Sequence, residues 1–167
     1  MDQHLRLVHP LQATPPTGLD AVAGLVGGAV GAFLTTLVVG AIMVALAPDY
    51  TERTMARVRS DPLGSALYGL VSLVFVVLVT VVLVFTIIGI ILAIPFALLA
   101  GLTWAVGAAV AFLAIAERLV GHEDGWTKPL VVAAALNGAL ALTGIGGFVA
   151  FAVGATGFGA ILRDWLE

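Results

Sequence analysis

The clearest cluster of side chains that could do chemistry is the contiguous run His122-Glu123-Asp124. Imidazole and carboxylate groups can bind a divalent metal or act as general acids and bases. These three residues are consecutive, however, and they lie in a polar stretch beside Gly125. We interpret the run as a solvated turn, and we expect neither a metal nor a cofactor.

Catalysis or proton transfer within a membrane needs ionisable groups inside the apolar segments. Residues 21–48, 62–116 and 129–162 contain no Asp, Glu, Lys or Arg. Their polar groups are a few hydroxyls, the Trp104 indole and the single amide of Asn137. Asn137 either bonds a neighbouring helix or lines a polar cavity. We expect a protein that is not an enzyme.

The basic side chains are concentrated in residues 51–60, where Arg53, Arg57 and Arg59 stand within seven positions. Arg53 and Arg57 share one face of a helix, and a small apolar side faces away from them. This favours a short interfacial helix whose arginines bind anionic lipid or a protein partner. A plain solvated helix is the alternative. No basic run is interleaved with aromatic residues, so we expect no nucleic-acid binding.

Small residues recur at a spacing of three or four, which lets membrane helices approach closely. The candidate helix-packing residues are Gly24, Gly27, Gly28, Gly31, Gly146, Ala150 and Gly154. The first four would form either a contact between copies of the chain or a contact within it. Ser65 and Gly69 have the same spacing.

Two apolar segments are interrupted by similar sequences, Leu83-Val84-Phe85-Thr86-Ile87-Ile88-Gly89 and Leu140-Ala141-Leu142-Thr143-Gly144-Ile145-Gly146. This similarity hints at an internal repeat. The threonines would satisfy carbonyls freed by a turn, or else line a permeation path. The candidate helix-break residues are Thr86, Gly89, Pro95, Thr143, Gly144, Gly146 and Gly147.

The composition requires a membrane as solvent for these segments. Of the 167 residues, 61% are hydrophobic and 10% are charged, and the mean hydropathy is +1.16. A small soluble globule cannot bury so much apolar surface. We therefore expect an all-α, polytopic membrane bundle of about four main segments, with Gly-interrupted or re-entrant helices.

The expected elements follow from the charge-free stretches and from the prolines that open or close them. A flexible tail over 1–18 precedes a single membrane domain over 19–167. That domain has transmembrane segments at 20–47, 62–85 and 95–118, an interfacial helix at 51–60, and an interrupted segment at 129–164. The last segment, too long for one straight crossing and short for two, is either a broken helix or a re-entrant hairpin.

Lysine and arginine accumulate on the cytoplasmic side of membrane proteins. The loops 49–61 and 119–128 hold most of these residues, so we expect both loops to be cytoplasmic in a multi-pass protein of the cell membrane. If 129–162 turns back, Arg163 joins the same side and only the N-terminus lies outside.

The order of these features resembles the multi-helix membrane domain associated with bactofilin-type, polymer-forming cytoskeletal proteins. The resemblance covers about 25–164, and it depends mainly on the connector Tyr50-Thr51-Glu52-Arg53 and Ala56-Arg57-Val58-Arg59-Ser60-Asp61-Pro62-Leu63, followed by the two breaks. It implies a membrane tether without catalytic residues. Here it would be a stand-alone version without the polymerising domain, and Pro95 follows the first break later than in the family pattern.

We therefore expect a non-enzymatic membrane scaffold or anchor that forms homo-oligomers, with the lipid bilayer and a cytoskeletal or other protein as partners. The alternative is a small channel or transporter for a neutral solute, built on the interrupted helices.

Overall fold

The computed structural model describes residues 18–166, which are all-helical and contain no strand. The helices are α1 (Gly18–Leu46), α2 (Pro48–Ser60), α3 (Pro62–Val84), α4 (Ile87–Val120), α5 (Thr127–Ala141) and α6 (Gly146–Leu166). The all-α class is confirmed, and α1, α3, α4 and α6 are long and apolar enough to cross a membrane. The tail expected over 1–18 falls, apart from Gly18, outside the described residues.

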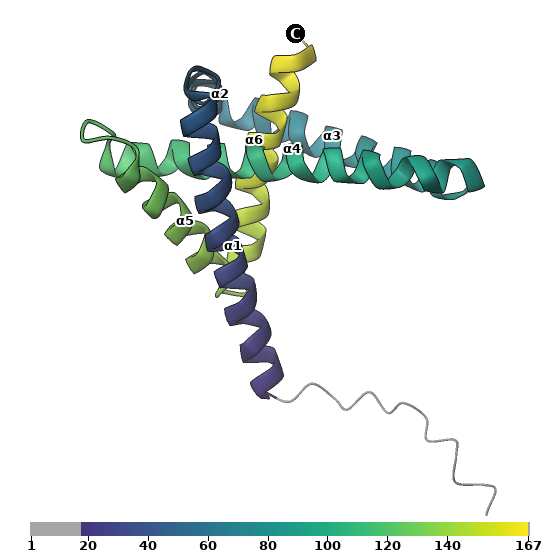
Figure 1. Cartoon of the computed structure of the whole chain (residues 1–167), viewed down its shortest axis with the longest axis horizontal. Coiled ribbons are helices and arrows are strands. Elements are labelled where there is room, and N and C mark those ends of the chain that lie inside the picture. Colours follow the sequence, from purple (N-terminus) through teal and green to yellow (C-terminus); the bar gives the residue numbers. More distant parts are fainter. Residues whose placement is uncertain (1–17, 167) are drawn as a thin grey trace, which may run out of the picture.

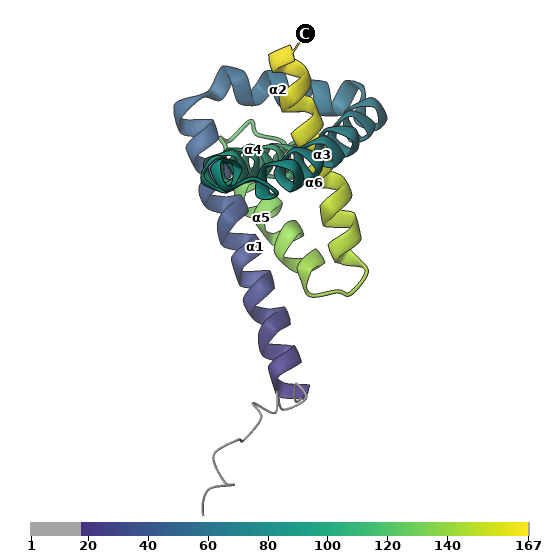
Figure 2. The same ribbon diagram turned by 90° about the vertical axis from the view of Figure 1, so that its right-hand side faces the viewer.

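Helix α4 is the centre of the molecule, because it contacts each of the other five helices. α3 runs back along α4 to form a long hairpin, which Figure 2 shows nearly end-on. α1 and α6 lie steeply across this hairpin, and α5 packs beside α1 (Figure 1). The helices therefore cross one another instead of forming a bundle of nearly parallel rods.

Prolines and one aspartate set the starts of α2 and α3. Pro48 and Pro62 lie in the first turns of these helices, where the missing N–H has no intrahelical partner to lose. The Asp61 carboxylate accepts a hydrogen bond of 2.9 Å from the N–H of Gly64, which caps α3. α2 thus begins three residues before the expected position 51.

The two interruptions are hairpin turns with the same hydrogen bonds. The Thr86 hydroxyl accepts the Gly89 N–H at 3.0 Å and donates to the Leu83 carbonyl at 3.2 Å. At the second turn the Thr143 hydroxyl accepts from Gly146 and donates to Leu140, both at 3.0 Å. One hydroxyl therefore satisfies backbone groups on both sides of each turn, as a low-dielectric environment requires.

The expected helix start at Pro95 is wrong. α4 begins at Ile87 and continues through Pro95, which lies inside the helix. The Thr86 hydroxyl caps α4 directly after α3 ends, so the helix has already begun eight residues before Pro95. Pro95 lacks the N–H that would bond to the carbonyl four residues earlier, but the helix continues through it. Gly89, Gly146 and Gly147 likewise lie within helical turns, so the breaks are confined to 85–86 and 142–145.

The segment 129–162 forms the hairpin α5–α6 and does not continue in one direction. α5 follows the loop after α4, and the far end of α6 returns to α2, where Arg163 lies 3.0 Å from Asp61. The sequence left two arrangements open, a broken helix and a re-entrant hairpin. The structure has the hairpin (Figure 2).

The crossing of α6 with α3 and α4 is a contact of backbone on backbone. A Cβ atom added at Gly159 would lie 1.9 Å from the Ser65 carbonyl oxygen, and one at Gly69 would lie 1.9 Å from that of Ala155. On the other side, a Cβ at Gly157 would lie 1.8 Å from the Gly107 oxygen. Only glycine fits at these positions, and the helices approach as closely as their backbones allow.

We predict that Gly107→Ala destabilises the protein, because the added methyl would lie 2.5 Å from the Phe158 amide nitrogen. Overpacking of this kind costs about 1–3 kcal/mol. Thermal unfolding in detergent micelles measures the loss. Gly101→Ala in the same helix is the matched control, since a Cβ there meets nothing within 4 Å. Equal stability of the two variants would contradict the close crossing.

We predict that Thr143→Val lowers the stability of the α5–α6 hairpin by about 1 kcal/mol or more, as loss of a helix cap does. Thr156→Val is the control, because the Thr156 hydroxyl only donates to the Ala152 carbonyl of its own helix. Chemical unfolding in micelles compares the two variants. A larger loss for Thr156→Val would contradict the capping role.

Candidate functional site

The charged side chains gather on one part of the molecule, which we call the charged face. It consists of residues 49–61, 117–128 and 163–164, and among the described residues it holds every Asp, Glu, Lys and Arg except Asp20. α2, the loop after α4 and the C-terminal end of α6 bring these residues together (Figure 1).

Ion pairs connect three helices across the charged face. Arg57 of α2 lies 3.1 Å from Asp164 of α6, and Arg59 of α2 pairs with Glu117 of α4. His122 Nδ1 lies 2.8 Å from the same Glu117 carboxylate, whose side chain is only 10% exposed. Removing one partner of such a half-buried pair leaves a charge without compensation.

Asp61 forms a further ion pair of the charged face. Its carboxylate accepts the Gly64 N–H and a hydrogen bond of 3.0 Å from Arg163 of α6. The backbone hydrogen bond first, and the arginine second, lower the pKa of Asp61 below its ordinary value. The aspartate that starts α3 therefore also holds the end of α6.

Helix α2 is packed more deeply than either interpretation of its sequence required. Met55 and Thr51 are fully buried, and Thr54 and Val58 are nearly so. The buried threonine hydroxyls donate to the carbonyls of Ala47 and Tyr50, which satisfies them without water. α2 thus lies across α4 and α6 and packs against both. The alternative interpretation of this segment as a plain solvated helix is therefore wrong.

The three predicted lipid- or partner-binding arginines do not form one free basic surface. Arg57 and Arg59 are engaged with carboxylates of α6 and α4. Arg53 is exposed, and its Nε donates to the Asp49 carbonyl at 3.2 Å. The described part of the chain therefore leaves Arg53 as the member of this set without a carboxylate partner.

Sequence reasoning missed Arg118. It is exposed, no ion pair joins it to a carboxylate of the described residues, and its Nη2 donates to the Arg59 carbonyl at 3.2 Å. It stands on the same face of α4 as Ala111, Ala114 and Ile115. The spacing of these residues, three and four apart, is the signal in the sequence that could have found it.

The run His122-Glu123-Asp124 is spread out at the loop. The His122 ring stacks on Trp126 with centroids 4.7 Å apart and faces Glu117, while Asp124 pairs with Lys128. Within residues 18–166, no three His, Asp or Glu side chains converge as a metal site would need.

The glycines predicted for packing divide into two groups. A Cβ at Gly24, Gly27, Gly28 or Gly31 would meet nothing within 4 Å. The buried positions of α1 are Ala29, Thr36 and Gly40, and at about 100° per residue they lie on the opposite side of the helix. The described part of the chain thus leaves the glycine face of α1 uncovered.

The remaining predicted packing residues lie inside the fold. Gly154 faces the Trp104 indole, which also approaches Phe151 and Phe158 with ring centroids 5.4 and 5.8 Å away. Ala150 packs against the core, and Gly146 belongs to the Thr143 turn. These contacts explain a tryptophan deep in an apolar helix.

Asn137 joins two helices. Its Nδ2 donates to the Thr36 hydroxyl at 2.8 Å and approaches the Ala32 carbonyl at 3.5 Å. The amide of α5 is therefore satisfied by α1, which is the helix-bonding alternative that the sequence left open.

The comparison with protein families gives one match, over residues 4–167, to a domain of unknown function designated DUF8173. The chain belongs to this family. No curated protein and no solved structure matches the chain. Because the match spans nearly the whole chain, the six helices and the charged face are features of a DUF8173 domain.

We predict that Glu117→Gln destabilises the protein by about 1–3 kcal/mol, because Arg59 and His122 lose their shared charged acceptor. Thermal unfolding in micelles at neutral pH tests this. Glu123→Gln, at an exposed loop position, should change the unfolding temperature little. Equal effects of both changes would show that Glu117 does not organise the charged face.

Proposed function

We propose that this DUF8173 domain is a non-enzymatic, multi-pass scaffold or anchor of the cell membrane that associates with copies of itself. The proposal competes with a small channel or transporter built on the interrupted helices. The two functions differ in what the interruptions do: a scaffold needs them as closed turns, and a channel needs them beside water.

One observation carries the proposal. The hydroxyls of Thr86 and Thr143 are occupied by the backbone groups of their own turns. Around them the tips of the two hairpins expose large apolar side chains, with Phe85 87% and Ile145 79% exposed. Such tips favour contact with lipid over contact with water, and their threonine hydroxyls are already engaged.

The uncovered glycine face of α1 supports self-association. The N-terminal end of α1 extends beyond the other helices (Figures 1 and 2), and a Cβ at any of its four glycines would meet nothing within 4 Å. A second α1 helix could approach this face closely, as small-residue faces do in membranes.

The distribution of basic residues supports a cytoplasmic charged face. Residues 49–61 and 117–128 contain five arginines and lysines, and Arg163 joins them through its ion pair with Asp61. By the positive-inside rule this face, with both loops, lies in the cytoplasm. A cytoskeletal polymer, the partner class implied by the bactofilin resemblance, would then meet the exposed Arg53.

The test uses the absence of cysteine from the chain. We predict that single cysteines introduced as Ile88→Cys and Ile145→Cys resist a membrane-impermeant maleimide added from either side of intact membranes. Both positions are at apolar hairpin tips, with Ile88 76% exposed. Glu123→Cys in the charged loop should react and serves as the control.

Labelling of both tips from the aqueous phase would overturn the scaffold in favour of the channel or transporter. Flux of small neutral solutes into liposomes that contain the purified protein would then be the confirming assay.

A further inference from the structure

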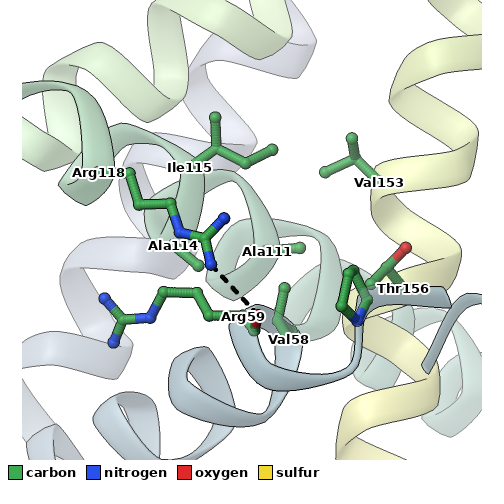
Figure 3. A pocket seen from close by; sticks show the side chains of 9 residues that line it. Val58, Arg59, Ala111, Ala114, Ile115, Arg118, Val153 and Thr156 are labelled. Atoms are coloured by element: carbon green, nitrogen blue, oxygen red, sulfur yellow. Dashed lines mark hydrogen bonds between the residues drawn. The ribbon is translucent and has the colours of Figure 1, made fainter. Parts of the chain in front are cut away.

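A pocket of about 190 Å³ opens between α2, α4 and α6 at the border of the charged face (Figure 3). Its lining is mostly apolar and its rim is basic. The apolar wall comes from α4, α6, the end of α2 and the start of α3: Val58, Pro62, Ala111, Ala114, Ile115 and Val153. Arg59, Arg118 and Thr156 complete the lining.

Arg118 is the positively charged side chain of this pocket that is available to bind a ligand. Figure 3 shows its guanidinium reaching toward the backbone of Arg59, whose carbonyl accepts one hydrogen bond at 3.2 Å. The Arg59 side chain points away from the pocket, toward its partner Glu117. Arg118 therefore keeps most of its five N–H donors for a ligand, while one hydrogen bond holds the guanidinium beside the pocket.

The setting of Arg118 differs from that of the other arginine without a carboxylate partner in the described residues. Arg53 shares its surroundings with Glu52 and Glu117 as well as with Arg59 and His122, so carboxylates there compete with an anion for the basic groups. The pocket beside Arg118 has no acidic side chain in its lining. A larger apolar pocket between α3, α4 and α6, of about 340 Å³, contains no cation at all.

We propose that the Arg118 pocket binds an anionic phospholipid. The phosphodiester accepts hydrogen bonds from the Arg118 guanidinium at the membrane surface, and one stretch of acyl chain lies against Ala114, Ile115 and Val153. The volume is below the roughly 300–1,000 Å³ of pockets that enclose a drug-sized ligand. It thus fits a segment of a flexible chain whose headgroup remains outside.

The inference goes beyond the scaffold role, and it rests only on the membrane embedding that the scaffold and the channel share. Labelling of the hairpin tips would contradict the scaffold proposal without affecting the proposed lipid site. Absence of a preference for anionic lipid would contradict the lipid site without affecting the scaffold proposal.

The test is lipid binding to the purified full chain in neutral detergent, counted by native mass spectrometry. The probes are dioleoyl phosphatidylglycerol, dioleoyl phosphatidylcholine and free glycerol phosphate. We expect the phosphatidylglycerol to bind at least about tenfold more tightly than the other two. Arg118→Gln should remove this preference, and the matched control Arg53→Gln should keep it.

A second variant distinguishes the contribution of the pocket to lipid binding from the contribution of the Arg118 charge. Val153→Phe fills the pocket and leaves every charged group in place, so it should weaken phosphatidylglycerol binding while thermal unfolding without lipid confirms that the variant is folded. Arg118→Gln receives the same unfolding check.

Four results would overturn the proposal. Equal binding of phosphatidylcholine would mean that the charge is not recognised, and equal binding of glycerol phosphate would mean a plain phosphate site. Equal losses in Arg118→Gln and Arg53→Gln, or full binding by a folded Val153→Phe, would mean diffuse attraction to the charged face.

Discussion

The contact of α6 with the backbones of α3 and α4 is the constraint on which the rest of the structure depends. Gly69, Gly107, Gly157 and Gly159 remove the side chains that would otherwise separate these helices. Because apolar side chains gain nothing from leaving lipid for one another, close backbone packing must supply much of the cohesion. The contact also brings the end of α6 to α2, where Asp61 and Arg57 bind it.

The sequence predicted the helical class, the start of α3 at Pro62, and both interruptions, because charge-free length and turn chemistry are local properties. It could not predict which glycines meet. Gly24 and its neighbours have the strongest small-residue pattern yet face open space, while Gly107 and Gly157, far apart in the chain, touch. It also missed that Glu117 pairs with Arg59 and that Arg118 borders a pocket, since both depend on how α2 lies across α4.

The two turns show how an apolar chain reverses direction without exposing its backbone. In both, a leucine carbonyl, a threonine hydroxyl and a glycine N–H stand three residues apart and form the same two bonds. A Cβ on either glycine would lie 2.0 Å from that leucine carbonyl oxygen, which explains why glycine occupies the third position. The similar sequences that hint at an internal repeat therefore form turns with the same hydrogen bonds.

The steep crossing of α1 and α4 has a consequence for the surrounding bilayer. No single membrane normal can run along both helices, and the apolar part of α4 alone, at 1.5 Å per residue, is roughly 45 Å long against a hydrocarbon core of about 30 Å. To remain immersed, the α3–α4 hairpin must lean by roughly half a right angle. A rod that leans by this angle is cut by each leaflet in an area about 1.5 times that of an upright rod, so each copy would displace more lipid than two upright helices of the same length.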